Sequence, residues 1–253
     1  MKALYKTSIL VIAAYVILIS KTVSADAATP SLSNTINPIL NSKLKTLLGP
    51  DEKFEIAPFN DAFDQVKVNN QVMLASKDGG YLFFGKVIDT STRADMMEVA
   101  NLQHRQTLIS SIPREKLLTY SAKEQRHRIT IFTDIDCPFC RKLHTQIKDL
   151  NQQGVTIDYV MIPRGQVGSK AFTKTVNALC ATNSQAAMDS AMHNGYFESN
   201  TQASSECINN LKTQQTLAQA FGFSATPTIL FANGEVAAGF INTQALLARL
   251  KSL

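Results

Sequence analysis

The four residues Cys137-Pro138-Phe139-Cys140 constrain the fold of this chain more than any other feature. They follow the apolar run Ile129–Thr133, which is typical of a buried strand, and precede Arg141–Ile147, which is typical of a helix start. A C-x-x-C pair at this junction places the first sulfur beside unpaired N–H groups of a helix N-terminus, which favour a thiolate. Because the thiolate is the attacking species in thiol–disulfide exchange, the motif predicts a redox-active dithiol. We expect Cys137 to be the more exposed nucleophile and Cys140 the resolving thiol.

Two other interpretations of Cys137 and Cys140 are a closed structural disulfide and half of a zinc site. Zinc needs four ligands, commonly two C-x-x-C units or added histidines. The chain has no second C-x-x-C, and only His127, His144 and His193 lie in this half of the sequence. We therefore predict redox catalysis without a metal. His144 is expected to be a helix-surface or packing residue, although a neutral imidazole can assist proton movement.

Residues 1–25 are typical of a secretory signal peptide, with a basic start, an apolar run at Ile9–Ile19 and small residues before the cleavage site. Cleavage is expected after Ala25, with Ala27 and Ala28 as the other candidates. The apolar run is shorter than the roughly 20 residues of a membrane-spanning helix. An uncleaved membrane anchor is the competing interpretation.

The charge of the chain gives no sign of nucleic-acid binding. The sequence holds 25 Lys+Arg and 20 Asp+Glu residues, a formal net charge of +5. Three of the lysines lie in residues 1–25, so the mature chain has 22 basic and 20 acidic residues and a net charge of +2. The basic residues are scattered, and no basic stripe alternates with aromatic residues.

All four cysteines lie in the C-terminal half, at positions 137, 140, 180 and 207. An even number in an exported protein permits disulfides, and the spacing favours pairing Cys180 with Cys207, although four cysteines allow three pairings. A bridge there closes a 28-residue loop, and the chain-entropy relation gives it about 3.6 kcal/mol of stabilisation. We predict a structural disulfide at this position.

The pattern along the chain predicts a small α+β unit over residues 31–90, a linker helix over 91–112, and a larger domain over 113–253. The first unit would bury little core alone, because it has only about 60 residues. It therefore either packs on the larger domain or pairs with its own copy. Its expected elements are a helix, Pro38–Leu48, and the strands Phe54–Ala57, Gln65–Val68, Val72–Ala75, Tyr81–Phe84 and Lys86–Ile88.

The linker is predicted to be one helix, Thr92–Ser111, and beyond it strands and helices alternate. Such alternation is typical of an α/β layer with a mixed sheet. The expected strands are Leu117–Tyr120, Ile129–Thr133, Val155–Ile162, Thr228–Ala232 and Glu235–Phe240, and the expected helices are Arg141–Gln152, 169–182, 184–194, 206–221 and Thr243–Leu253.

The strand, the C-x-x-C, the helix and the distant Thr226-Pro227 together resemble the thioredoxin fold, in which this proline is cis and faces the active-site cysteines. The stretches Phe132–His144, Ser224–Pro227 and Asn233-Gly234, with the second cysteine pair, resemble the DsbC and DsbG family of periplasmic disulfide isomerases.

This resemblance implies a thioredoxin-fold catalytic domain with a helical insertion and an N-terminal dimerisation domain joined by a linker helix. It further implies a V-shaped homodimer with its sites facing a shared apolar cleft, and contacts to substrate through Thr226, Pro227, Pro138 and Phe139. The expected partners are misoxidised exported proteins and, as electron donor, a membrane thiol reductase of the DsbD type. No bound cofactor is implied.

Two features near the motif differ from the proteins that this chain resembles. The dipeptide Pro138-Phe139 resembles DsbG, whereas DsbC carries Gly-Tyr, and these residues tune the redox potential. Ile131 occupies the place of thioredoxin's buried acid, and the charge of Asp136 opposes the helix dipole at Cys137, which leaves the balance open.

The predicted function is isomerisation or reduction of incorrect disulfides in the periplasm, together with chaperone activity. The alternatives are a DsbG-like reductase of sulfenylated cysteines, a dithiol oxidase, and a protein that acts mainly as a holdase chaperone.

Overall fold

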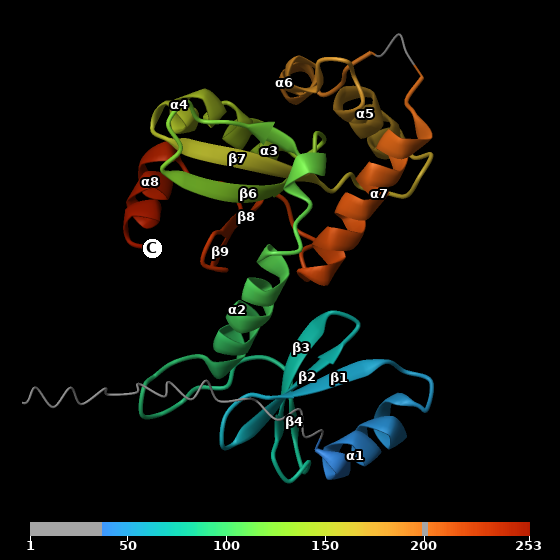
Figure 1. Ribbon diagram of the computed structural model, residues 1–253, viewed down its shortest axis with the longest axis vertical. Coiled ribbons are helices and arrows are strands. Elements are labelled where there is room, and N and C mark those ends of the chain that lie inside the picture. Colours follow the sequence, from blue (N-terminus) through green and yellow to red (C-terminus); the bar gives the residue numbers. More distant parts are fainter. Residues whose placement is uncertain (1–36, 199–201) are drawn as a thin grey trace, which may run out of the picture. The chain divides into compact units, whose positions relative to one another are not determined.

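The computed structural model describes residues 37–198 and 202–253 (Figure 1). The predicted signal peptide, residues 1–25, lies outside the described residues. Within the described part of the chain, no helix has the length and apolar character needed to cross a membrane.

The first unit is an antiparallel sheet with one helix, as predicted. The helix α1 (Pro38–Leu48) begins where the side chain of Asn37 accepts a hydrogen bond from the backbone N–H of Leu40, and Pro38 suits the first helical position. Its buried face packs on the inner side of the sheet. The strands run in the order β1 (Phe54–Pro58), β2 (Phe63–Val68), β3 (Gln71–Ser76) and β4 (Leu82–Phe83).

The strand predicted at Lys86–Ile88 is wrong. Only Ile88 makes a β-bridge, with Asp95, and the segment belongs to the loop that precedes the next helix. The carboxylate of Asp89 accepts hydrogen bonds from the N–H groups of Ser91 and Thr92 and so folds this loop into a turn. The segment therefore does not extend the sheet beyond β4.

The linker helix α2 (Met96–Ile109) is shorter than the predicted Thr92–Ser111. Asp95 caps it by accepting a hydrogen bond from the N–H of Met97, and Arg93 has a positive φ of 62°, which excludes it from the helix. Farther along α2, the Arg105 side chain donates to the carbonyl oxygen of Gly234 at 2.7 Å.

The second sheet is mixed, as predicted, with the strand order β5-β7-β6-β8-β9. The pair β6 and β7 is parallel and the other pairs are antiparallel. Every residue of β7 is buried, which is typical of a central strand covered on both faces. The bounds are β5 (Leu118–Tyr120), β6 (His127–Thr133), β7 (Val155–Met161), β8 (Thr228–Phe231) and β9 (Val236–Ala238).

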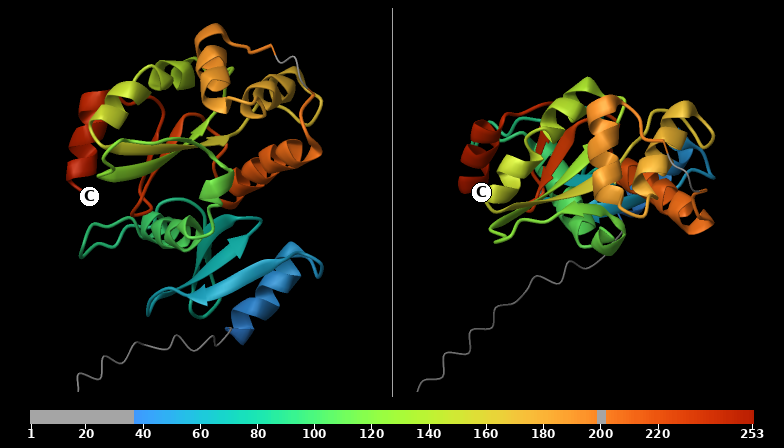
Figure 2. Two further views of the ribbon diagram at one scale, coloured as in Figure 1. Left: turned by 45° about the horizontal axis from the view of Figure 1, so that its top comes forward. Right: turned by 90° about the horizontal axis from the view of Figure 1, so that it is seen from above.

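Alternate residues of β6 enter two different cores. Ile129 and Ile131 pack with helices on one side, and Phe132 packs on the other side against residues of α7 and the segment that follows it. The helices α3 and α6 lie on the same side of the sheet (Figure 2). A 3₁₀ helix, Arg114–Lys116, precedes β5, and the α-helices are α3 (Pro138–His144), α4 (Ile147–Gln152), α5 (Lys170–Leu179), α6 (Ser184–Asn194), α7 (Ser205–Ala220) and α8 (Thr243–Lys251).

The single helix predicted at Arg141–Gln152 is wrong, because α3 and α4 are separate and α3 begins at Pro138. The break falls at Gln146, whose N–H bonds to the carbonyl of Leu143 three residues earlier. Its side-chain oxygen accepts from the N–H and the hydroxyl of Thr243 at the start of α8. The contact between Gln146 and Thr243 joins distant parts of the chain, so the sequence around Gln146 does not predict it.

Candidate active site

The C-x-x-C motif lies where β6 passes into α3, as predicted. After β6 the chain makes a tight turn in which the N–H of Cys137 donates to the carbonyl of Asp134 at 3.1 Å. Cys137 has extended backbone angles and stands immediately before the first helical residue, Pro138. Cys140 follows within the first turn of α3, so the two sulfurs belong to the start of one helix.

The distant Thr226-Pro227 loop meets this turn. The Thr226-Pro227 peptide bond is cis, as the resemblance implies. The Sγ atom of Cys137 lies 3.3 Å from the carbonyl oxygen of Thr226 and donates to it when protonated. The fold therefore brings together residues that are 89 positions apart in the sequence.

The surroundings of Cys137 favour its thiolate. Burial raises the pKa of this thiol, but hydrogen bonds from the Thr226 side chain, from the N–H and thiol of Cys140 and from the N–H of Phe139 lower it by more. The carbonyl of Thr226 favours the protonated thiol, yet these donors prevail, and the pKa of Cys137 lies below the ordinary value of 9.0. A larger fraction of Cys137 is therefore ready to attack at neutral pH than in a free cysteine.

Cys140 has the opposite character. Burial raises its pKa to about 12, against the smaller lowering effect of a hydrogen bond with the Thr133 side chain. Both thiols are free. The predicted difference in exposure is small, because 3% of Cys137 and 1% of Cys140 is accessible. Hydrogen bonding, more than exposure, separates the two cysteines.

The acids before the motif are both paired with cations. The carboxylate of Asp136 lies 2.7 Å from the ammonium of Lys174, and that of Asp134 lies 3.2 Å from Nε of Arg164. Asp134 is buried, and burial raises its pKa. The pairing of Asp136 with Lys174 offsets its charge beside Cys137.

Comparisons with known proteins place these features in a family. Residues 114–253 match the family described as Thioredoxin-like domain. The DsbC thiol:disulfide interchange protein of Salmonella typhimurium is 30% identical over 175 residues, which cover 69% of this chain and 70% of that protein. This chain belongs to the DsbC family. The DsbC of Dickeya dadantii is 28% identical over 185 residues, covering 73% of this chain and 74% of that protein.

Among solved structures, a linker-deletion N6K mutant of Proteus mirabilis ScsC has a TM-score of 0.53 at 15% identity. The likeness covers 62% of this chain and 85% of that one, and it supports the fold alone. Membership of the DsbC family makes the chain a thiol:disulfide interchange protein with oxidoreductase and isomerase activity.

The DsbC-family motif of this chain presents an apolar residue to solvent. Pro138 is exposed as the first residue of α3, and 60% of Phe139 is accessible. Arg141 does not face the sulfur as a free charge, because its guanidinium donates to the carbonyls of Met192 and His193 in α6.

The predicted disulfide is confirmed. Cys180 and Cys207 are bonded, with 5.9 Å between their Cα atoms. The bond joins the end of α5 to the first turn of α7, so it closes the helical insertion. Among residues 37–198 and 202–253, no group of three or more His, Cys, Asp and Glu side chains is placed to hold a metal ion.

His144 is the site residue that the sequence underestimates. Its side chain is 12% exposed and bonded at both ring nitrogens, to Tyr159 in β7 and to Asp189 in α6. Its position four residues after Cys140 was the available signal, since residues i and i+4 share a helix face. Tyr159 and Asp189 belong to no motif, and only the tertiary fold brings them to α3.

Proposed function

We propose that Cys137 is the nucleophile and Cys140 the resolving thiol of a periplasmic enzyme that isomerises or reduces incorrect disulfides in exported proteins. The observation that supports this most directly is the pair of free thiols with opposite pKa shifts at the start of α3. Family membership supplies the reaction type, since the DsbC relatives are thiol:disulfide interchange proteins.

The reaction begins when the Cys137 thiolate attacks one sulfur of a client disulfide, which forms a mixed disulfide and releases the other client sulfur as a thiolate. The released client thiolate then attacks a second client disulfide and frees another client thiolate. A client thiolate finally attacks the client sulfur of the mixed disulfide, which forms a new client disulfide and releases the Cys137 thiolate. Alternatively, Cys140 attacks Cys137, which closes the Cys137–Cys140 bond and leaves the client reduced.

We assign the contacts with the client to Thr226, Pro227, Pro138 and Phe139. The Thr226-Pro227 loop lies against the Cys137 sulfur, and Pro227 has no N–H, so the carbonyl of Thr226 is the backbone group available to an extended client segment. The exposed ring of Phe139 offers an apolar contact beside the sulfur. Unfolded clients expose apolar side chains, which suits such a surface.

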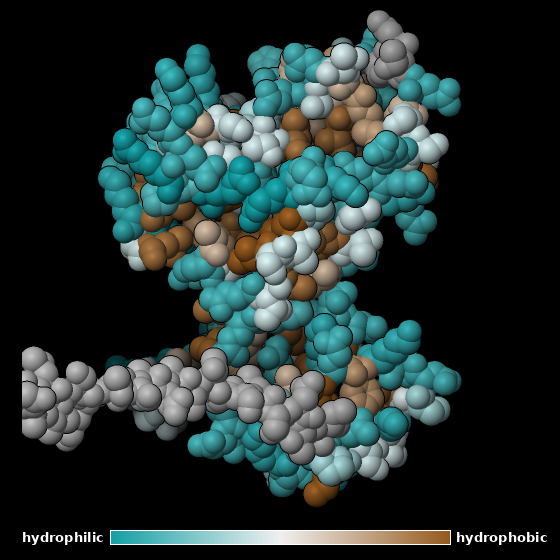
Figure 3. All heavy atoms as spheres, viewed as in Figure 1, coloured by the Kyte–Doolittle hydropathy of each residue, from teal (hydrophilic) through white to brown (hydrophobic). Residues whose placement is uncertain are grey.

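We further propose a homodimer formed through the predicted unit of residues 31–90. Its strand β4 lies at one edge of the sheet, with β3 as its only neighbour among the described strands. Exposed apolar side chains gather in the same unit, and in the view of Figure 3 apolar patches interrupt a mostly hydrophilic surface. The exposed residues are Ile39, Leu47, Tyr81, Phe84 and Ile88.

The proposed cellular setting follows from the chemistry and the predicted signal peptide. Resolution by Cys140 oxidises the active site, so each reductive turnover needs two electrons from a donor. A membrane thiol reductase of the DsbD type would supply them by exchange with the Cys137–Cys140 disulfide.

The test is the redox state of Cys137 and Cys140 in the cell, measured by acid quenching followed by thiol alkylation. A Cys180→Ala/Cys207→Ala variant is the control, because every thiol that reacts in it belongs to the motif. We expect a mainly reduced pair. A mainly oxidised pair would contradict the isomerase proposal and favour the dithiol oxidase.

A further inference from the structure

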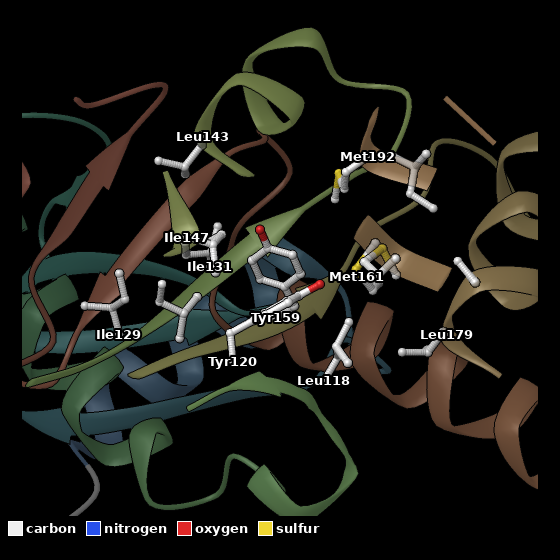
Figure 4. Packing of buried hydrophobic residues seen from close by; sticks show 14 of the residues in the cluster. Leu118, Tyr120, Ile129, Ile131, Leu143, Ile147, Tyr159, Met161, Leu179 and Met192 are labelled. Atoms are coloured by element: carbon white, nitrogen blue, oxygen red, sulfur yellow. The ribbon is translucent and has the colours of Figure 1, made fainter. Parts of the chain in front are cut away.

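A chain of hydrogen bonds runs from the protein surface to the region behind the active-site helix. Asp189 of α6, whose side chain is 58% exposed, lies 3.1 Å from Nε2 of His144. Nδ1 of His144 lies 2.8 Å from the hydroxyl of Tyr159. Tyr159 is almost completely buried in β7, beside Tyr120 (Figure 4). The hydroxyl of Tyr120 also donates to Asp189.

The partners of His144 determine its tautomer. A carboxylate only accepts hydrogen bonds, so Nε2 carries the proton that is shared with Asp189. Burial lowers the pKa of His144, although Asp189 opposes this, and the ring is neutral at pH 7. Nδ1 is therefore bare and accepts from Tyr159, whose pKa burial raises well above its ordinary value, so that it stays protonated.

The inner end of this hydrogen-bonded chain lies in the core that α3 covers, where Tyr159 packs in the same cluster as Leu143. Cys140 and His144 are four residues apart on α3 and share one face of that helix. Tyr159 is paired in register with Ile131 of β6, two residues before Thr133, and the Thr133 side chain hydrogen-bonds the Cys140 thiol. Charge on Cys140 also contributes to the raised pKa of Tyr159.

We propose that Tyr159 and His144 accept the thiol proton of Cys140 when Cys140 resolves the mixed disulfide. This inference rests on the proposed roles of Cys137 and Cys140. The protein then has a route for the Cys140 proton that does not need a buried acid at position 131, which is Ile131.

The Cys140 proton passes to the oxygen of Tyr159 as the Tyr159 hydroxyl proton passes to Nδ1 of His144. The Cys140 sulfur bonds to the Cys137 sulfur, the bond between Cys137 and the client breaks, and the electron pair leaves with the client sulfur. Cys137 and Cys140 are oxidised and the client sulfur is reduced. The imidazolium of His144, stabilised by Asp189, later returns its proton to solvent or to the client thiolate.

The charged and titratable groups around His144 come from four elements. They are Cys140 on α3, Tyr120 on β5, Tyr159 on β7, and Asp189 and His193 on α6. The cations nearest in sequence point elsewhere, since Arg141 bonds carbonyls of α6 and Lys142 lies over the ring of Phe240.

Asp134 is the competing proton acceptor, because it is buried and lies near the motif. One of its oxygens accepts from the N–H of Asp136, and its carboxylate is paired with Arg164. Both contacts favour the charged acid, but burial outweighs them and raises the pKa of Asp134, so this carboxylate competes for the proton. Asp134 therefore provides the variant that can overturn the proposal.

The experiment follows the two half-reactions in one absorbance recording. Reduced protein is mixed with excess dithiobis(nitrobenzoate), a disulfide reagent that releases a coloured thiol when Cys137 attacks it. A second coloured thiol is released when Cys140 attacks the mixed disulfide on Cys137. Both release rates are measured from about pH 6 to pH 9 in the wild type and in His144→Gln, Tyr159→Phe, Asp189→Asn and Asp134→Asn. His127→Gln is the matched control, because His127 begins β6 at the end opposite to Thr133.

We expect His144→Gln and Tyr159→Phe to slow the second release by about tenfold or more at pH 7 and to change the first by less than about twofold. In these variants the second rate should rise about tenfold per pH unit, because Cys140 must then ionise unaided. The wild-type rate should depend on pH more weakly. Asp189→Asn, which changes an exposed residue, should give a smaller loss in the second release.

An unchanged second release, equal slowing of both releases, or a larger deficit in Asp134→Asn would each overturn the proposal. If Tyr159→Phe does not fold, His144→Gln and Asp189→Asn decide the matter. A wild-type protein that releases no coloured thiol contradicts instead the proposed role of Cys137, so the two failures are distinguishable.

Discussion

The two cysteine pairs occupy regions of very different construction. Cys137 and Cys140 are three residues apart at the start of α3, and both are free thiols. Cys180 and Cys207 are 27 residues apart and are bonded between the end of α5 and the first turn of α7. The first pair is surrounded by hydrogen-bond donors from the motif and from the Thr226 loop. The second lies against the apolar core, where Cys180 packs.

This difference shows what makes a pair of sulfurs reactive. Donors directed at Cys137 stabilise a thiolate, and burial keeps Cys140 protonated, which fits the proposed roles of nucleophile and resolving thiol. The Cys180–Cys207 bond instead closes a long loop, whose entropy it removes from the unfolded chain. We therefore expect the first pair to control activity and the second to control stability.

Replacement of the nucleophile tests this separation most severely. Cys137→Ala should reduce disulfide interchange to the uncatalysed rate, because Cys140 is buried and has a pKa of about 12. The measurement is the rate at which a scrambled disulfide protein regains activity. Cys180→Ala/Cys207→Ala should keep most of this rate below its melting temperature. If Cys137→Ala retains more than about a tenth of the wild-type rate, the assignment of the nucleophile is wrong.

Loss of the second disulfide should give the largest effect on stability. Removing the 28-residue loop that Cys180 and Cys207 close should lower the free energy of unfolding by about 3.6 kcal/mol in the chain-entropy relation. Denaturant unfolding of Cys180→Ala/Cys207→Ala against wild type, both with reduced Cys137 and Cys140, measures this difference. Cys137→Ala/Cys140→Ala is the matched control and should change the free energy much less. Equal losses in the two double variants would remove the contrast between the pairs.

The sequence predicts the parts of this comparison that depend on local pattern. The C-x-x-C between a strand and a helix predicts the reactive turn, and the spacing of Cys180 and Cys207 favours their bond. The elements that it misplaces depend on tertiary contacts. Gln146 breaks the predicted helix because its side chain binds Thr243, which lies 97 residues away. The sequence does not predict the pairing of His144 with Asp189 for the same reason, because it joins two helices that only the fold brings together.

The Thr226 hydroxyl should have a moderate effect that is confined to the reactive pair. Thr226→Val removes a donor to Cys137 and should raise the pKa of that thiol by about one unit, since a hydrogen bond to a charged group is worth about 1.5 kcal/mol or more. At a pH below the pKa of Cys137, the thiolate fraction then falls about tenfold, but the more basic thiolate is about threefold more nucleophilic, so the rate of attack falls about threefold.

Titration of the thiolate absorbance measures this shift in Cys140→Ala protein, where Cys137 is the only free thiol. Thr213→Val, on α7, is the control for loss of a threonine hydroxyl. An unchanged or lower pKa of Cys137 in Thr226→Val would show that the Thr226 hydroxyl does not donate to the thiolate, because the carbonyl contact at 3.3 Å is the same in both proteins.

The smallest expected effect is that of the Asp136–Lys174 ion pair on the pKa of Cys137. The direction of this pKa shift is more informative than its size. Lys174→Ala leaves Asp136 unpaired beside Cys137, so the pKa of Cys137 should rise, by less than about half a unit because exposed charges are well screened. Asp136→Asn should lower it. Lys170→Ala, four residues earlier and exposed, is the control. Both shifts should shrink in 1 M salt, where the Debye length is about 3 Å. Shifts of the same sign would mean that these variants act by moving the turn, since a purely electrostatic effect must change sign with the charge removed.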